Sequence, residues 1–155
     1  MKRTIAVTSM CVLVLLVSSN ARADNNAVAE NWIEVWNSHD VERILSVFTP
    51  DVFYEDVPFG VVNHGAVEFR AFALGFITAV PDVRLELVKS SLKGGHGTIE
   101  WVLSGTDVGL YKTGRRFSVR GVTVIEVEGE LISRNSDYYD LATIQRQLGL
   151  LPSGL

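Results

Sequence analysis

The spacing of apolar residues along the first half of the chain is typical of helices. Residues 25–37 place two tryptophans four positions apart, with further apolar side chains on the same helical face. Asp40 is suited to cap a second helix that begins just after it. Residues 66–80 are apolar with a helical period, and Pro81 ends that segment. We therefore expect three helices in the first half of the chain.

In the second half the period changes to two residues, which is typical of strands. The alternation predicts strands over residues 83–92, 98–106, 116–127 and 130–139, after an earlier short strand over residues 51–57. A last short helix is predicted over residues 141–148. Helices followed by a run of antiparallel strands indicate an α+β fold. We expect a curved antiparallel sheet wrapped around the N-terminal helices, with a cone-shaped apolar cavity between them.

The first 23 residues have the pattern of a secretory signal sequence. Lys2 and Arg3 precede an apolar run over residues 5–17, and Ala21-Arg22-Ala23 is a small-x-small cleavage pattern. The apolar run is shorter than the roughly 20 residues of a membrane-spanning helix. We therefore expect cleavage at about Ala23 and export to the periplasm or out of the cell. The mature domain would then cover residues 24–155, with no membrane anchor.

Cleavage would also change the charge and remove the one cysteine, Cys11. It removes three of the 14 basic residues and none of the 18 acidic ones, so the net charge falls from −4 to −7. An acidic chain is poorly suited to bind nucleic acid. Thiol nucleophiles and cysteine-based metal sites are then excluded, and the three histidines are too widely spaced for a metal-ligand motif. We expect no metal ion, no other cofactor and no nucleic-acid partner.

Residues 53–60, Phe-Tyr-Glu-Asp-Val-Pro-Phe-Gly, place an acid among apolar neighbours at the end of a strand. Tyr54 and Asp56 share one strand face. Burial in an apolar pocket would raise the pKa of Asp56 from its usual value near 3.9 toward neutrality, as a general base requires. Alternatively, Asp56 caps a turn by accepting backbone N–H groups near Phe59 or Gly60. Tyr54 would orient Asp56 or bind the same substrate oxygen, or serve as a core residue.

Asp137 is the second candidate acid, because it shares a strand face with Asn135 and Tyr139. Several polar residues on a face that should line a cavity favour a site, although pairing with Arg134 is an alternative. Aromatic side chains should build most of the core, and some of them should line the cavity and contact a ligand: Trp32, Phe72, Phe76 and Trp101. Thr123 and Tyr139 are further candidate ligand contacts.

The order of elements, with Asn-Ser-His-Asp at residues 37–40, the acidic strand at 54–60 and Asp-Tyr-Tyr-Asp at 137–140, resembles the nuclear transport factor 2-like superfamily. Within it, the chain is similar to SnoaL-like polyketide cyclases, ketosteroid isomerases and limonene-epoxide hydrolases. The resemblance covers residues 26–152. It implies a cystatin-like α+β barrel that hosts both enzymes and binding modules.

The resemblance also implies roles for particular residues. Asp56 falls on the base of the ketosteroid isomerases, whereas the two donor positions of that family are occupied by Trp32 and Thr123. Tyr54 and Asp137 match two members of the epoxide hydrolase set, whose Arg-x-Asp strand is replaced here by residues 101–103. Asp137 is also the best match to the catalytic aspartate of the SnoaL-like cyclases. No one family pattern is complete.

Two hypotheses for the function follow. The first is a cofactor-free acid/base enzyme of the isomerase, cyclase or epoxide hydrolase type, in which Asp56 and/or Asp137 acts on a small apolar substrate. Trp32, Tyr54 or Thr123 would then support the developing oxyanion. The second is a non-catalytic module that binds a small ligand or a protein. Residues 116–127 carry apolar side chains on both faces of their strand, which predicts a homodimer through the outer face of the sheet.

Overall fold

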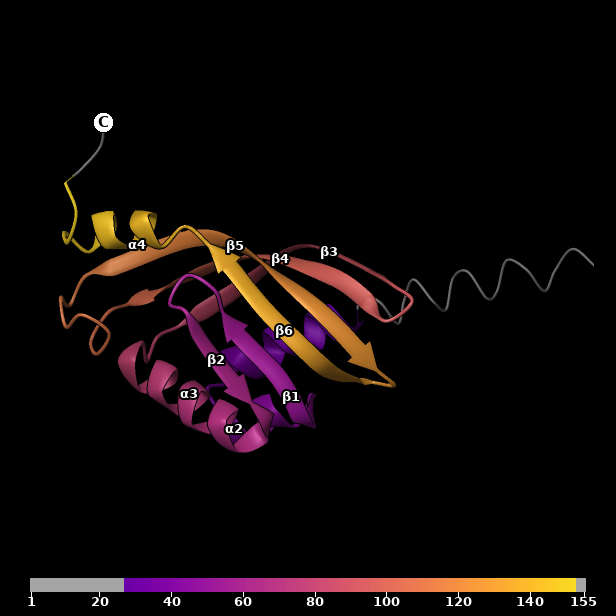
Figure 1. The fold of residues 1–155 in the computed structure, drawn as a ribbon. Helices are drawn as coiled ribbons and strands as arrows, with labels where there is room; N and C mark the ends of the chain where they lie inside the picture. Colours follow the sequence, from indigo (N-terminus) through magenta and orange to yellow (C-terminus); the bar gives the residue numbers. More distant parts are fainter. Residues whose placement is uncertain (1–26, 153–155) are drawn as a thin grey trace, which may run out of the picture.

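A computed structural model describes residues 27–152, which form a six-stranded sheet with the N-terminal helix and α3 packed on its concave face (Figure 1). A helix over residues 27–37 comes first. It is followed by α2 (Val41–Leu45), β1 (Phe48–Asp56), β2 (Val61–His64), α3 (Gly65–Ala79), β3 (Arg84–Lys93), β4 (His96–Thr106), β5 (Arg116–Glu128), β6 (Leu131–Tyr139) and α4 (Leu141–Gln147). The α+β fold predicted from the sequence is confirmed.

The strand order in the sheet is β2-β1-β6-β5-β4-β3. Neighbouring strands are antiparallel except β1 and β6, which run parallel, so the sheet is mixed and the expectation of a purely antiparallel sheet needs this correction. The physical reason is the long connection between β1 and β6, since parallel neighbours need a crossover rather than a hairpin. The short strand β2 was not expected, because its four residues are too few to show a period.

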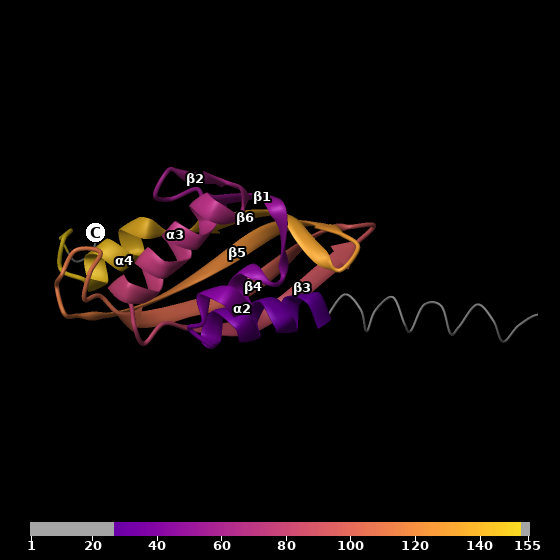
Figure 2. The same ribbon diagram turned by 90° about the horizontal axis from the view of Figure 1, so that it is seen from below.

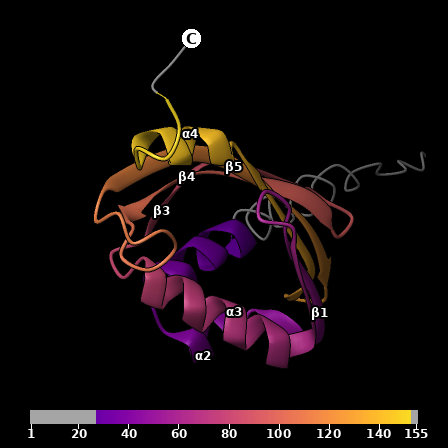
Figure 3. The same cartoon turned by 60° about the vertical axis from the view of Figure 1, so that its left-hand side comes forward.

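The sheet curves around the N-terminal helix. Figure 3 shows the indigo helix of residues 27–37 beneath the arch of β4 and β5, with α3 beside it. Figure 2 shows both helices on the same, concave face of the sheet. The helix α4 lies on the other face, at the start of β5, where the Gln147 side chain accepts from the Ser118 N–H and donates to the Ser118 carbonyl. The space on the concave face is therefore enclosed by helices on one side and by strands on the other.

The helix ends carry the caps expected of their residue types, including the cap predicted at Asp40. The Asp40 carboxylate accepts from the backbone N–H groups of the first turn of α2, and the Asp140 carboxylate accepts from the Thr143 N–H in α4. The helix α3 ends at Ala79, just before Pro81. The two-residue turn between β3 and β4 uses Gly94 and Gly95, both with positive φ, as a tight hairpin requires.

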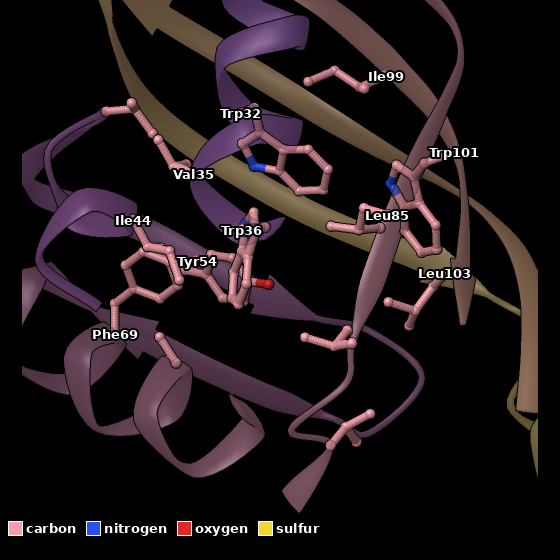
Figure 4. Close-up of a cluster of buried hydrophobic side chains, with 14 of the residues drawn as sticks. Trp32, Val35, Trp36, Ile44, Tyr54, Phe69, Leu85, Ile99, Trp101 and Leu103 are labelled. Carbon is pink, nitrogen blue, oxygen red and sulfur yellow. The ribbon is translucent and has the colours of Figure 1, made fainter. Parts of the chain in front are cut away.

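The core lies between the helices and the concave face of the sheet. It is unusually aromatic: Tyr54 stacks on Phe69 at 4.2 Å between ring centroids, and Trp36 meets Phe69 and Phe76 edge to face. Figure 4 shows Trp32, Trp36 and Tyr54 facing Leu85, Trp101 and Leu103 across this interior. Because the aromatic rings come from different layers, they fix the spacing between helices and sheet.

The predicted signal sequence over residues 1–23 and its cleavage site lie outside the described residues. Within residues 27–152, no helix has the length and apolarity that crossing a membrane requires.

Candidate functional site

The polar centre of the molecule is a block of side chains on the adjacent strands β1, β6 and β5. Asp56 on β1 is the register partner of Asp137 on β6, and Tyr54 is the partner of Asn135. Thr123 on β5 stands opposite Asp137. Side chains two residues apart share a strand face, so all five belong to the concave face, and all are buried. The parallel pairing of β1 with β6 therefore brings the two candidate acids together.

Asp137 is held by three donors. The Tyr54 hydroxyl donates to Oδ2 at 2.5 Å, whereas the Thr123 hydroxyl and the Asn135 amide donate to Oδ1 at 2.6 and 2.9 Å. Burial raises the pKa of Asp137 to about 6; the three hydrogen bonds oppose this rise, and the neighbouring Asp56 adds to it. The carboxyl group is thus fixed in one orientation and titrates near neutral pH.

Two indole groups lie behind Asp137 and orient its partners. The Trp101 N–H donates to the Thr123 hydroxyl oxygen at 2.8 Å, and the Trp32 N–H donates to the Asn135 side-chain carbonyl at 3.0 Å. These bonds leave the Thr123 hydroxyl hydrogen and the Asn135 amide free to point at Asp137. The arrangement is a converging network in which the orientation of each donor is set by a tryptophan.

Asp56 has a different environment at the end of β1. The Tyr139 hydroxyl lies 3.0 and 2.9 Å from its two oxygens, and the Phe59 N–H donates to Oδ1 at 3.1 Å. Burial raises the pKa of Asp56, and the two donors oppose the rise. Asp56 therefore caps the turn after β1, as one of the two interpretations predicted, and it also lines the inner cavity.

The two phenols remain protonated donors. Burial, followed by the neighbouring Asp137 carboxyl, holds the pKa of Tyr54 well above its usual range. Burial and the neighbouring Asp56 carboxyl raise the pKa of Tyr139 far above its usual value. Each carboxyl group is therefore paired with a tyrosine that stays neutral at physiological pH.

Two adjoining spaces reach this block. The first is an inner cavity of about 40 Å³, lined by Trp32, Trp36, Tyr54, Asp56, Phe72, Phe76, Leu85, Trp101, Leu103, Asp137 and Tyr139. The second is a more open groove of about 280 Å³, lined by Asp56, Phe59, Val61, Ala71, Phe72, Gly75, Phe76 and Leu110. Asp56, Phe72 and Phe76 border both spaces.

Eight of the nine predicted site residues line the inner cavity: Trp32, Tyr54, Asp56, Phe72, Phe76, Trp101, Asp137 and Tyr139. Thr123, predicted as a substrate contact, does not; its hydroxyl is fully buried between Trp101 and Asp137. The Trp32 N–H is likewise engaged with Asn135 rather than directed at a ligand. For both residues the geometry supports a positioning role instead of oxyanion support.

The sequence placed Asn135 on the same strand face as Asp137 but did not identify it as a site residue. The outer groove was not predicted. The groove depends on the connection between β4 and β5, which shows no periodic pattern. There the buried Asp107 accepts N–H groups from Tyr111 and Thr113, and so shapes the loop that carries Leu110. Among residues 27–152 no group of three His, Asp or Glu side chains could hold a metal ion.

A curved sheet that encloses an apolar cavity, with carboxylates on its concave face, defines the class of ketosteroid isomerase-like α+β folds. Solved structures show the same architecture. A protein of that fold from Catenulispora acidiphila, solved with trimethylamine, superimposes with a TM-score of 0.74 at 25% identity over 80% of this chain and 93% of its own. TsrD from Streptomyces laurentii has a TM-score of 0.72 at 27% identity over 84% and 98% of the two chains.

The chain belongs to the SnoaL-like polyketide cyclase family, whose model matches residues 26–148. The cyclase AurE of Calcarisporium arbuscula is 31% identical over 100 residues, which cover 64% of this chain and 74% of that protein. The family match confirms the resemblance to SnoaL-like polyketide cyclases that was drawn from the sequence.

Proposed function

We propose that the protein is a cofactor-free acid/base catalyst of the cyclase or isomerase type, which acts on a small apolar molecule that carries a carbonyl group. The observation that carries the proposal is the pair of register-matched carboxyl groups, Asp56 and Asp137, each buried and each bound by its own tyrosine. Two like charges side by side in an apolar site disfavour double ionisation, so at and below about pH 6, the pKa of Asp137, one ionised and one protonated carboxyl group is the favoured state.

The different environments of Asp56 and Asp137 favour different chemical roles for the two acids. Asp56 borders the open groove, whereas Asp137 is confined to the inner cavity and its pKa is about 6. We assign Asp56 as the base that removes a proton from the carbon next to the carbonyl group. The electron pair of that C–H bond moves to the carbonyl oxygen, and protonated Asp137, assisted by Tyr54, donates a hydrogen bond to it.

The resulting enolate has two outcomes. In an isomerase, Asp56 returns its proton to another carbon of the enolate. In a cyclase, the enolate carbon forms a bond to a second carbonyl carbon, and a proton goes to the oxygen of that second carbonyl. Both outcomes use the same residues, and which one occurs depends on the substrate. The same acid/base pair also suits the opening of an epoxide by water: Asp56 removes a proton from a water molecule, the water oxygen forms a bond to an epoxide carbon as the C–O bond breaks, and Asp137 gives a proton to the released oxygen.

The proposal is tested by hydrogen exchange at carbon. The protein is incubated in D₂O with 2-tetralone, a fused-ring ketone with an acidic C–H group beside the carbonyl, and loss of that proton is followed by NMR. The protein should accelerate exchange well beyond an equal concentration of free acetate, which supplies the same base without a site. A rate equal to that of acetate would leave the binding-module hypothesis as the better account.

One observation favours that second hypothesis. The Asp56 carboxylate accepts the Phe59 N–H, so the acid has a structural task in ending β1 whether or not it reacts. In this account the buried carboxyl groups and the aromatic walls serve to bind a small apolar ligand that has a hydrogen-bonding group.

We also propose that the mature protein begins near Asp24, is exported, and forms a homodimer. Support for export is the charged and apolar pattern before Ala23. N-terminal sequencing of exported protein that still begins at Met1 would contradict it. Support for the dimer comes from Val124 and Tyr138, which lie on the outer face of the sheet and are 39% and 42% exposed.

A further inference from the structure

The hydrogen-bond donors around the inner cavity are almost all used within the protein. Five of the side chains that line it carry a permanent N–H or O–H group: Trp32, Trp36, Tyr54, Trp101 and Tyr139. Four of them donate to neighbouring side chains at distances between 2.5 and 3.0 Å. The fifth is Trp36, whose indole N–H has no hydrogen-bond partner among residues 27–152.

Trp36 is fixed in the core, so its donor cannot turn outward to water. The residue is 3% exposed, and its ring packs edge to face against Phe69 and Phe76. Figure 4 shows this ring close to those of Trp32 and Tyr54. Aromatic faces are weak acceptors, and an unpaired buried donor lowers stability. Because Trp36 lines the cavity, a molecule that enters the cavity can supply the acceptor that this N–H lacks.

The size and charge of the cavity limit what that acceptor can be. A volume of about 40 Å³ has room for only a few non-hydrogen atoms, since one water molecule needs roughly 10–15 Å³ by the same measure. Asp56 and Asp137 line the cavity, and no lysine or arginine does, so an anionic group would lack a cationic partner there. An uncharged oxygen, such as that of a carbonyl group, fits both limits.

We propose that the Trp36 N–H is a catalytic donor, which binds the carbonyl oxygen of the substrate and the enolate oxygen that forms from it. This inference rests on the proposed function, because Asp56 creates the charge that the donor stabilises. As Asp56 takes the proton from carbon, the electron pair of the C–H bond forms a carbon–carbon double bond and the carbonyl π pair moves to oxygen. The indole keeps its proton and bonds the charged oxygen more strongly than the neutral one.

This donor complements Asp137, whose oxygens already accept three hydrogen bonds from the protein. Asp137 donates only in its protonated form, whereas an indole N–H keeps its proton over the whole physiological pH range. The donor positions implied by the family resemblance, Trp32 and Thr123, are both engaged within the network. Trp36 lies one helical turn after Trp32, and its donor remains free for a ligand.

The direct test follows the indole N–H signals of the wild-type protein by nitrogen-15 NMR. The chain has three tryptophans, so the spectrum has three such signals. Addition of 2-tetralone should move the Trp36 signal downfield, whereas the signals of Trp32 and Trp101, whose donors are engaged, should move much less. Tetralin, which has the same two rings without the oxygen, should not produce this downfield shift.

Saturation transfer from protein to ligand measures the binding of both compounds in the same samples. A bound ketone that leaves the Trp36 signal unmoved would overturn the proposal, as would an equal shift with tetralin. Absence of ketone binding would overturn it too, because the proposal requires this oxygen to reach the cavity.

Trp36→Phe keeps an aromatic ring in the core and removes the donor. The kcat for exchange of 2-tetralone should fall about 100-fold, whereas KM should rise at most about tenfold, because the hydrogen bond is stronger to the enolate. Val35→Ala is the matched control: Val35 is buried on the same helix and lines neither space, so its kcat should stay within twofold of wild type. A folded Trp36→Phe protein with the wild-type kcat would contradict the assignment, and if this variant does not fold, the NMR test still decides.

The donor and the proposed function fail in different ways. If the wild type exchanges 2-tetralone but the Trp36 signal and Trp36→Phe show no effect, the donor is wrong and the function stands. If the ketone shifts the Trp36 signal but the wild type exchanges no faster than acetate does, Trp36 is a ligand-binding donor and the acid/base function is wrong.

Discussion

Asp56 and Asp137 are register partners in the parallel strand pair β1–β6, and their side chains lie on the same face of the sheet, one at the mouth of the cavity and one behind it. Each has its own tyrosine and its own backbone or side-chain donors, and burial raises the pKa of both. Because the two groups differ in depth, they should also differ in protonation, and this difference underlies the proposed assignment of base and acid.

The raised pKa of Asp137 should be visible in the pH dependence of stability. In the unfolded chain an aspartate titrates near 4, whereas Asp137 in the folded protein titrates at about 6. Between these values the folded state binds more protons, so this residue makes the free energy of unfolding fall as the pH rises from 4 to 7. At one pKa unit per 1.36 kcal/mol, the contribution is up to about 3 kcal/mol.

Asp137→Asn removes this contribution, so the variant should gain stability relative to wild type as the pH rises through that range. Denaturation by urea at several pH values measures the difference. A difference between the two proteins that does not change from pH 4 to 7 would show that Asp137 is not perturbed.

The two tyrosines should act on different carboxyl groups. The Tyr54 hydroxyl stabilises ionised Asp137, so Tyr54→Phe should raise the pKa of Asp137 further, and Tyr139→Phe should do the same to Asp56. Carbon-13 NMR titration of labelled aspartate carboxyl groups separates the two effects. Equal shifts of both carboxyl groups in both variants would contradict the pairing.

Gly121 should be intolerant of any side chain. It lies opposite Trp101 in the register of β4 and β5, and a Cβ atom there would overlap the indole ring. Gly121→Ala should displace Trp101, weaken its bond to Thr123 and lower the free energy of unfolding by about 1–3 kcal/mol. The same change at Gly75, in open space on α3, should be neutral or stabilising by up to about 1 kcal/mol. Urea denaturation that finds both variants alike would refute this account of the sheet.

A homodimer through the outer face of the sheet predicts that one charge there separates the subunits. Val124→Glu should yield a monomer in sedimentation at micromolar concentration, whereas the wild type should sediment as a dimer. Val67→Glu, at an even more exposed apolar position on α3, is the control and should remain dimeric. A wild-type protein that sediments as a monomer would contradict the proposed homodimer.

The sequence predicted the strand faces well because alternation has a period of two whatever the sheet order. Tyr54 with Asp56, and Asn135 with Asp137, were placed on common faces for that reason. It could not predict that β1 and β6 are parallel neighbours, because that pairing joins residues about 80 positions apart and depends on how the intervening elements pack. The meeting of Asp56 and Asp137 in one site came from the structure and from no local pattern.

The sequence also could not predict the roles of Trp32 and Thr123 or the presence of the groove. A tryptophan or threonine at a given position carries a donor, but the direction of that donor depends on its neighbours across the sheet. The resemblance placed Trp32 and Thr123 at donor positions, and the structure shows that their hydrogen bonds are already used within the network around Asp137. The sequence did not point to Gly75, because a single exposed glycine in a helix does not contribute to the hydrophobic periodicity.

The measurement that tests the central claim most directly is the exchange of 2-tetralone by Asp56→Asn. The asparagine carbonyl can still accept the Phe59 N–H and the Tyr139 hydroxyl, so the turn and the melting temperature should be preserved. Asp140→Asn, at the exposed cap of α4, is the matched control and should exchange as wild type does. If Asp56 is the base, the exchange rate should fall at least about 100-fold; a folded Asp56→Asn protein with the wild-type rate would contradict the account.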